Sequence, residues 1–320
     1  MVLRCRPDAD GVAKALRKME KIVTLTPLMP AQIGGRSVWL KAESLQPMGA
    51  FKLRGAWHRL TDLSDDERFR GVVAFSSGNH AQGVAWAARR LGVSATIVMP
   101  ADTPAKKLEN TRALGAEVIL YDRMTERREE IAARIAAERG SVVVPSFDDP
   151  WVVEGQGSAG LEAIHQMAAL GVAPPDLVVT PCGGGGLAAG LALACPDAGI
   201  ALVEPEGWDD MTRSLEAGKI VPVGAEPKAT SCDALQTLRV AELTFDILKA
   251  RGAYGLAVTE AETGAAMRWA FDNLRLVLEP GGAVALAALL TGKVTPSERT
   301  LVILSGGNVD AATFKRMTGL

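Results

Sequence analysis

The chain has 320 residues, of which 48% are hydrophobic and 22% are charged. This composition excludes a disordered chain and supports a large buried core, which at the usual domain size of roughly 150 residues corresponds to about two domains. Lys plus Arg number 35 and Asp plus Glu number 37, so the formal net charge is −2. A protein with this balance has no general basic surface for nucleic acid or an anionic membrane.

The cysteines and the N-terminus indicate a cytoplasmic protein. The cysteines are scattered and form no CxxC pair, so neither a disulfide framework nor a structural zinc site is expected. The first 21 residues, MVLRCRPDADGVAKALRKMEK, are charged throughout and lack the apolar segment of a secretory signal. The weakly polar run at 281–290 is too short to cross a bilayer.

The first elements to stand out alternate between strand and helix. Strands are predicted at 72–75, 95–99, 117–121 and 141–145, and helices at 81–91, 104–114 and 125–139. Such a β-α-β rhythm is typical of parallel strands joined by right-handed crossovers. We therefore expect a small open sheet in this part of the chain.

A second set of elements surrounds the first. Strands are predicted at 37–41, 176–180, 199–204, 255–259 and 300–304, and helices from 51 and at 152–170, 187–194, 262–274 and 283–290. The predicted fold is α/β, with two open, twisted, mostly parallel sheets flanked by helices. Residues 71–145 would form a small domain, inserted into a larger domain made of residues 1–70 and 146–320.

A lysine in an apolar setting follows the first strand of the larger domain. In the segment KAESLQPMGAFKLRGA, Lys52 lies between Phe51 and Leu53, just after a glycine turn. An apolar environment lowers the pKa of a lysine and suits it to Schiff-base chemistry. A solvated lysine at the start of a helix is the alternative interpretation.

A polar loop, SSGNHAQG at residues 76–83, joins a predicted strand to a helix. Free backbone N–H groups at a helix N-terminus favour an anion, so this loop is suited to a carboxylate. An ordinary helix cap is the alternative, but a cap requires only one of these polar residues.

A glycine-rich loop, PCGGGGL at residues 181–187, follows another predicted strand. Its backbone can approach a phosphate closely, although a flexible turn would also explain the glycines. Gly184, Gly186 and Ala189 also satisfy G-x-G-x-x-A, and Glu204 follows Gly184 by 20 residues. That spacing is typical of dinucleotide binding, so an NAD-dependent enzyme remains an alternative.

The last predicted strand leads into SGGNVD at residues 305–310. A serine at a strand end can donate a hydrogen bond to a ring nitrogen or accept one from it, and a plain turn is the alternative.

In their order along the chain, GAFKLRGA, SSGNHAQG, EGQGSAGLE, GGGGL and SGGNVD resemble the serine/threonine dehydratase and serine racemase family. The resemblance extends from Thr26 to Asp310.

Members of this family are enzymes of the tryptophan-synthase-β type (fold type II) that depend on pyridoxal 5'-phosphate (PLP). The resemblance implies that Lys52 bonds to PLP covalently and later moves the substrate α-proton. Phe51 would lie against the pyridine ring, Asn79 would bind the phenolic oxygen and Ser305 would contact the pyridine nitrogen. The phosphate would be held by backbone N–H groups of Gly183, Gly184, Gly185, Gly186 and Leu187.

The resemblance also implies the reaction, a β-elimination that converts L-threonine or L-serine to a 2-oxo acid and ammonia. The amino-acid carboxylate would be received by Ser76, Ser77, Gly78, Asn79, His80 and Gln82. Serine racemisation is an alternative, in which Ser77 would act as a base on the face opposite Lys52. A 3-hydroxyaspartate dehydratase is another, since Arg128 matches an arginine that holds a second carboxylate.

A divalent cation, Mg²⁺ or Ca²⁺, is the further cofactor that the resemblance implies. Its ligands would be Glu204, the backbone carbonyl of Trp208 and Asp210, which are the hard oxygen donors that these ions prefer. An acidic surface loop is the alternative for VEPEGWDD. The family also implies a homodimer that acts on a small amino acid. Ala50 and Ala234 depart from the family pattern, which leaves a non-catalytic binding protein as a last alternative.

Overall fold

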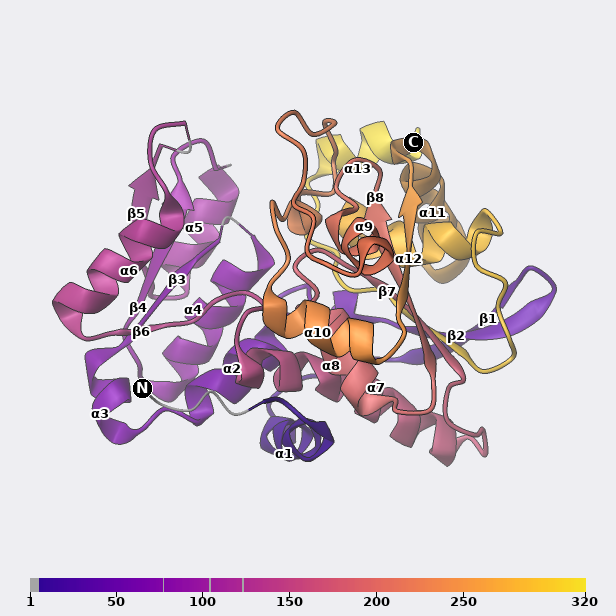
Figure 1. Ribbon diagram of the computed structural model, residues 1–320, viewed down its shortest axis with the longest axis horizontal. Coiled ribbons are helices and arrows are strands. Elements are labelled where there is room, and N and C mark those ends of the chain that lie inside the picture. The colour runs from indigo at the N-terminus through magenta and orange to yellow at the C-terminus, as the bar shows by residue number, and fades with distance from the viewer. Residues whose placement is uncertain (1–5, 77, 104, 123) are drawn as a thin grey trace.

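The computed structural model describes residues 6–76, 78–103, 105–122 and 124–320. They form a six-stranded sheet and a four-stranded sheet, each packed between helices (Figure 1). Helices α4, α5 and α6 surround the smaller sheet, and α7 to α13 lie with the larger one (Figure 1). The predicted α/β fold with two mostly parallel sheets is confirmed.

The larger sheet has the strand order β1-β2-β10-β7-β8-β9. Strands β1 and β2 form an antiparallel hairpin, whose turn at Gly34 and Gly35 has φ angles of +59° and +74° that favour glycine. The remaining neighbours are parallel, with Leu301 of β10 paired to both Trp39 and Val178. The strand bounds are β1 Leu28–Ile33, β2 Arg36–Lys41, β7 Leu177–Pro181, β8 Gly199–Pro205, β9 Tyr254–Val258 and β10 Thr300–Ile303.

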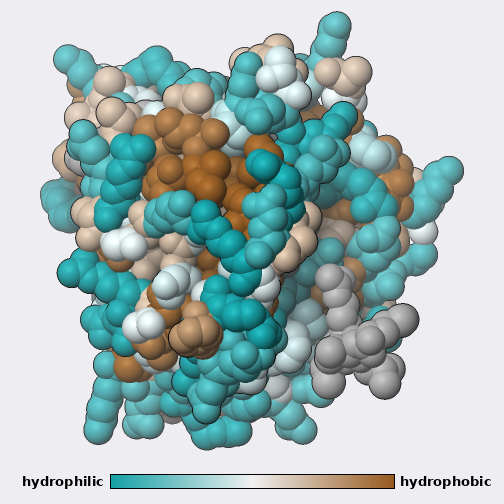
Figure 2. All heavy atoms as spheres, turned by 90° about the vertical axis from the view of Figure 1, so that its left-hand side faces the viewer, coloured by the Kyte–Doolittle hydropathy of each residue, from teal (hydrophilic) through white to brown (hydrophobic). Residues whose placement is uncertain are grey.

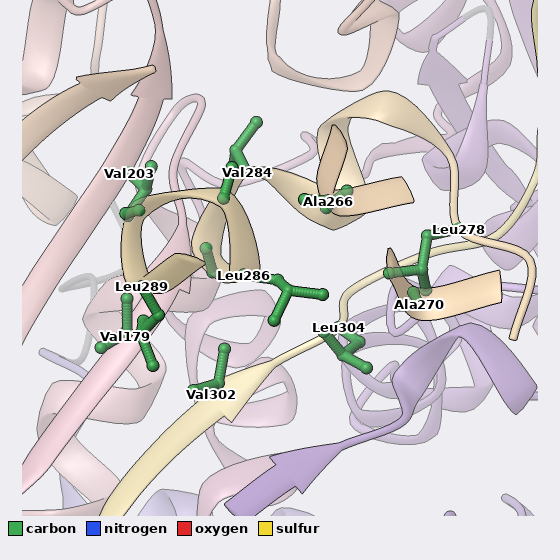
Figure 3. Close-up of a cluster of buried hydrophobic side chains, with 14 of the residues drawn as sticks. Val179, Val203, Ala266, Ala270, Leu278, Val284, Leu286, Leu289, Val302 and Leu304 are labelled. Carbon is green, nitrogen blue, oxygen red and sulfur yellow. The ribbon is translucent and has the colours of Figure 1, made fainter. Parts of the chain in front are cut away.

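Alternate residues of these strands enter different hydrophobic clusters on the two faces of the sheet. Val179, Val203 and Val302 pack with α11 (Glu260–Leu274) and α12 (Pro280–Leu290), and Leu286 and Leu289 of α12 lie among them (Figure 3). Their neighbours along the strands pack on the other face with α7 (Pro150–Ala169), α8 (Gly186–Ala194) and α10 (Glu242–Ala250). Burial on both faces explains why these strands are continuously apolar.

The smaller sheet is entirely parallel and has the order β5-β4-β3-β6. Helices α2 (Leu53–Thr61) and α4 (Asn79–Leu91) pack on one face and α6 (Arg128–Arg139) on the other. Viewed from the left-hand side of Figure 1, where the smaller sheet lies, the molecular surface is mainly hydrophilic, with hydrophobic side chains gathered near the top (Figure 2). The remaining bounds here are β3 Val72–Phe75, β4 Ala95–Pro100, β5 Glu117–Tyr121, β6 Val142–Val143 and α5 Ala105–Ala113.

Several elements differ from those expected from the sequence. The edge strand β1 was not anticipated, because its pattern LMPAQI contains proline and lacks clear alternation. β6 is shorter than the predicted 141–145, since it pairs only at Val142 and Val143. The helices missed were α1 (Ala9–Met19), α3 (Asp65–Arg70), α9 (Asp210–Ala217), α10 and α13 (Ala311–Thr318). In the described ranges, no helix combines the length and hydropathy needed to span a bilayer.

Candidate active site

A cavity lies between the two sheets, where several parallel strands end. Phe75 and Ser76 reach it from β3, Pro181 from β7 and Ser305 from β10. In open parallel sheets this is where ligands gather, since the loops at the carboxyl ends of the strands converge. The cavity is therefore built by segments from both sheets that are distant in the sequence.

Lys52 is partly buried in the wall of this cavity, directly before helix α2. Its Nζ atom donates a hydrogen bond to the carbonyl oxygen of Ser146 at 3.0 Å and lies 5.3 Å from the centre of the Phe51 ring. Desolvation lowers the pKa of Lys52 to about 8, which is the shift predicted for an apolar setting. The lysine thus holds a substantial neutral fraction near neutral pH.

Close helix packing fixes the backbone around Lys52. A Cβ atom on Gly155 of α7 would lie 2.5 Å from the Cα atom of Gly55, and one on Gly157 would lie 2.5 Å from the carbonyl oxygen of Gly190 in α8. The glycines of the EGQGSAGLE motif therefore let α7 approach α2 and α8 at the same time. This motif contributed to the family resemblance, but the sequence had not revealed what it does.

Buried ion pairs reinforce the same region. Arg54 donates from Nε to Oε2 of Glu43 at 2.7 Å and from Nη2 to Oε1 of Glu162 at 2.9 Å. Lys41 also donates to Glu162, so two cations and two carboxylates neutralise one another between β2, the short helix Glu43–Leu45, α2 and α7. Because Arg54 is two residues from Lys52, this network anchors the start of α2 and positions the lysine.

The glycine loop between β7 and α8 meets the requirements of a phosphate site. Gly185 has φ +87°, and a Cβ atom there would lie 2.7 Å from Cε of Met211 and 2.9 Å from Cβ of Thr244. Within the described chain, no backbone carbonyl accepts from the N–H groups of residues 183–187, although the Gly185 N–H interacts with the Cys182 thiol. Such donors at a helix N-terminus favour an anion, and the loop lines the cavity. These residues fit the phosphate of PLP.

Asn79 is held by two side chains that the sequence analysis did not assign. Its Nδ2 atom donates to Oε1 of Glu279 at 2.6 Å, and its Oδ1 atom accepts from Nδ2 of Asn308 at 2.8 Å. These bonds fix which end of the amide donates and leave the second Nδ2 hydrogen available. Burial raises the pKa of Glu279 to about 7, although the bond from Asn79 opposes the shift.

His80 lines the cavity as a neutral ring. Nε2 donates to the carbonyl oxygen of Val144 at 2.8 Å, while Nδ1 has no partner in the described part of the chain. Burial, assisted by the nearby Lys52 charge, lowers the pKa of His80 to about 3. An imidazole whose single N–H is occupied cannot donate to a carboxylate, so the ring offers only its Nδ1 lone pair.

The other predicted residues are distributed as follows. Ser76, Gly78 and Arg128 line the cavity, whereas Gln82 lines a neighbouring one. The Arg128 guanidinium lies 5.6 Å from the centre of the Phe75 ring and pairs with Glu129 at 2.8 Å. Ser305 also lines the cavity, as do Phe51 and all five residues of the predicted phosphate set. Ser77 lies outside the described residues.

The predicted cation site lies beside the glycine loop. Glu204 is fully buried at the end of β8 and accepts from the backbone N–H groups of Met211 at 3.1 Å and Thr212 at 2.8 Å. Asp210 is also buried, and neither of its carboxyl oxygens has a partner in good hydrogen-bond geometry in the described segments, although the backbone N–H groups of Asp210 and Val240 are near enough to oppose the rise that burial causes in its pKa. Burial raises the pKa of Glu204 to about 8 and of Asp210 to about 7. An unpartnered buried carboxyl fits a cation. The predicted ligand at Trp208 is its backbone carbonyl, whereas the indole N–H of this residue donates to the backbone carbonyl of Lys228.

The described ranges contain no cluster of three or more His, Cys, Asp or Glu side chains arranged for a metal. Any cation here would therefore need the backbone carbonyl of Trp208 and water in addition to the carboxylates.

Glu204 is also the residue whose spacing from Gly184 suggested a dinucleotide-binding site. Its carboxylate caps α9 from inside the protein, where it cannot meet a ribose.

A partly buried lysine of lowered pKa, a glycine loop at a helix N-terminus and a serine at a strand end fit a PLP-binding α/β enzyme. The comparisons with known proteins agree. The family model described as "Pyridoxal-phosphate dependent enzyme" matches residues 19–306. The chain therefore belongs to the pyridoxal-phosphate-dependent enzyme family, and PLP, not NAD, is its cofactor.

Relatives with assigned names are similar over nearly the whole of this chain. An L-threo-3-hydroxyaspartate ammonia-lyase from Pseudomonas is 41% identical over 95% of this chain and 96% of that protein. An L-threonine ammonia-lyase from Thermotoga maritima is 37% identical over 96% of this chain and 77% of that protein. The structure of maize serine racemase has a TM-score of 0.90 and 33% identity, covering 98% of this chain and 97% of the other.

Proposed function

We propose that the protein is an ammonia-lyase that removes the β-hydroxyl group of L-threonine or L-serine and releases a 2-oxo acid and ammonia. The observation that carries this proposal is Lys52, a lysine of lowered pKa in a cavity shared with the glycine loop and Ser305. The relatives named as ammonia-lyases support the reaction class. We assign the cofactor to Phe51, Lys52, Asn79, Ser305 and residues 183–187.

The chemistry that PLP supplies when bound is withdrawal of electrons from the substrate α-carbon. Lys52 moves the α-proton, and its pKa of about 8 suits this role because both protonation states are accessible near neutral pH. Glu279 and Asn308 hold the Asn79 amide in one orientation, in which its remaining Nδ2 hydrogen would be available to the phenolic oxygen of the cofactor. Ser305, which lines the cavity, would offer a neutral hydroxyl to the ring nitrogen. A neutral partner would limit electron withdrawal and favour expulsion of the β-hydroxyl group.

We assign the substrate carboxylate to the loop before α4. The helix N-terminus contributes the backbone N–H groups that follow Gly78, because the N–H of Gly78 itself donates to Oγ of Ser76 at 3.2 Å and so positions that hydroxyl group. The neutral His80 ring shapes this pocket without adding charge. Gln82 would act from the edge of the site, since it lines the neighbouring cavity.

A second candidate function is dehydration of a 3-hydroxyaspartate. Arg128 lines the cavity and is held over the Phe75 ring, where its guanidinium could bind a second carboxylate. The 41% identity to a hydroxyaspartate ammonia-lyase supports this candidate. Racemisation of serine would require Ser77 as the base on the opposite face from Lys52, and similarity to serine racemases supports it.

The remaining assignments are parts of the same proposal. The small domain comprises residues 71–145, supported by the fact that all strands of the four-stranded sheet fall between Val72 and Val143. Residues 1–70 and 146–320 form the large domain. We propose a cytoplasmic homodimer on the strength of the family resemblance, with its mass in solution measurable by light scattering.

Glu204, the Trp208 carbonyl and Asp210 are proposed to bind Mg²⁺ or Ca²⁺. The unpartnered carboxyl of Asp210 supports this assignment. Adding either ion to chelator-treated protein should raise the melting temperature, because a ligand that binds only the folded state stabilises it. Asp210→Asn should abolish the increase, whereas Asp246→Asn, at an exposed position of α10, should retain it. An equal increase in both variants would contradict the assignment.

A substrate panel tests the activity. L-Threonine, L-serine and L-threo-3-hydroxyaspartate are incubated with the holoenzyme, and ammonia, 2-oxo acid and the chirality of residual serine are measured. The proposal predicts 2-oxo acid from threonine or serine in the wild type and none from Lys52→Ala. Turnover confined to hydroxyaspartate would select the second candidate, and D-serine without oxo acid would select racemisation. Deamination by Lys52→Ala would contradict all three.

A further inference from the structure

An ion pair between the two sheets lies at the edge of the active-site cavity. Nζ of Lys107, in α5, is 2.7 Å from Oδ2 of Asp233, in the short helix η2 (Asp233–Leu235). Both residues line the active-site cavity, and both also line the neighbouring cavity that contains Gln82. The pair therefore separates the two cavities and faces the space that a substrate side chain would enter.

The charges of this pair act inside the cavity. Lys107 lowers the pKa of the buried Glu279, and Asp233 raises it, in addition to the larger effect of burial. Their side chains are 28% and 55% exposed, so the pair is not sealed from solvent. Partly exposed ion pairs contribute little stability, because water solvates the separated charges well. A substrate carboxylate can therefore replace the Asp233 carboxylate at Lys107 with little loss of free energy.

We propose that Lys107 and Asp233 determine whether the site accepts a substrate with a second carboxylate. This inference rests on the proposed function and extends it to a residue pair that selects substrates by the charge of their side chains. Asp233 occupies the ammonium group of Lys107 and places a negative charge at the cavity edge. A neutral substrate such as serine leaves the pair intact, whereas a dicarboxylic amino acid must compete with Asp233 for Lys107.

The expected effect follows from Coulomb's law. One unit charge at roughly 7 Å and an effective dielectric constant of about 40 changes binding about tenfold. Asp233→Asn should raise kcat/KM for L-threo-3-hydroxyaspartate relative to L-serine about tenfold, since Lys107 is then unpaired. Lys107→Gln should lower the same ratio about tenfold, because Asp233 then repels the second carboxylate.

Matched controls carry the same chemical changes at ion pairs away from both cavities. Asp272→Asn removes the partner of Arg268, and Lys293→Gln removes the partner of Glu262. Neither control should alter the substrate ratio. Raising the salt concentration should reduce the effects of Asp233→Asn and Lys107→Gln, as expected for charges that are partly exposed to solvent.

A binding measurement separates this inference from the proposed reaction. L-Aspartate and L-alanine have no β-hydroxyl group to eliminate, so their dissociation constants can be read from the change in cofactor absorbance without turnover. Asp233→Asn should favour aspartate over alanine about tenfold, and Lys107→Gln should disfavour it. Unchanged ratios in both folded variants would overturn the inference, even if serine is deaminated. Absence of turnover in the wild type would refute the proposed function and leave these ratios measurable.

Discussion

The lowered pKa of Lys52 predicts how the apoenzyme recovers its cofactor at different pH values. Only the neutral amine attacks an aldehyde, so the rate of covalent attachment follows the neutral fraction. With a pKa of about 8, about 9% of Lys52 is neutral at pH 7, compared with about 0.03% of a lysine at the usual value of 10.5. The difference in pKa corresponds to about 3 kcal/mol in favour of the neutral form.

The assay mixes PLP with the apoenzyme between pH 6 and 10 and follows the absorbance of the lysine-bound cofactor. The initial rate should rise about tenfold from pH 6 to 7, about fivefold from 7 to 8 and less than twofold from 8 to 9. Nα-acetyl-lysine serves as the reference amine and corrects for titration of PLP itself. Lys52→Ala should show no lysine-bound absorbance.

A rate that continues to increase about tenfold per unit up to pH 10, in parallel with the reference amine, would refute the reasoning. It would mean that water reaches the Lys52 ammonium group freely and that the cavity wall does not desolvate it. A rate that is half-maximal near pH 8 and levels off above about pH 9 in the protein alone would support the geometry, in which the ammonium group has only the Ser146 carbonyl as a hydrogen-bond acceptor among the described residues.

Three substitutions test other parts of the structure. Gly185→Ala should weaken PLP binding at least tenfold in an equilibrium titration of the apoenzyme, because φ is +87° and the new Cβ would lie 2.7 Å from Met211. Glu43→Ala should lower the free energy of unfolding in urea by about 3–5 kcal/mol, because Arg54 would keep a buried charge without its main partner. Leu202→Ala should lower it by about 2–5 kcal/mol through the cavity left between β8 and its covering helices.

Each substitution has a matched control. A Cβ atom at Gly224 would meet open space, so Gly224→Ala should leave PLP affinity unchanged. Glu242→Ala breaks an exposed ion pair with Arg239 and should change stability by less than about 1 kcal/mol. Leu238→Ala removes a leucine that is 65% exposed and should have a similarly small effect. If the PLP affinity or the free energy of unfolding fell as much in a control as in its matched test variant, the assigned contact would not be the cause.

Hydrophobic pattern and turn residues were sufficient to predict most of the fold. The strands 72–75 and 117–121 have the predicted bounds, since each is a short apolar run ended by polar or glycine-containing segments. α1 was missed because charged residues are interspersed through it, although Val12, Ala15 and Met19 recur at helical spacing and pack against α2 and α7. A contact between distant segments has no local signature in one sequence.

The site was predictable where one loop carries its own chemistry. The glycine loop and the polar loop before α4 were recognised because several unusual residues are consecutive. Glu279, Lys107 and Asp233 were not assigned, because each is an ordinary charged residue next to a helix or turn. Their roles depend on Asn79 and on the cavity, which only the folded chain brings together.

Locating the lysine that bonds to PLP tests the central claim most directly. Reduction of the holoenzyme with borohydride fixes the cofactor on its lysine, and peptide mass spectrometry then identifies the modified residue. The structure predicts one modified peptide, carrying PLP on Lys52, and none from Lys52→Ala treated in the same way. Stoichiometric modification of another lysine, with Lys52 unmodified, would contradict the account.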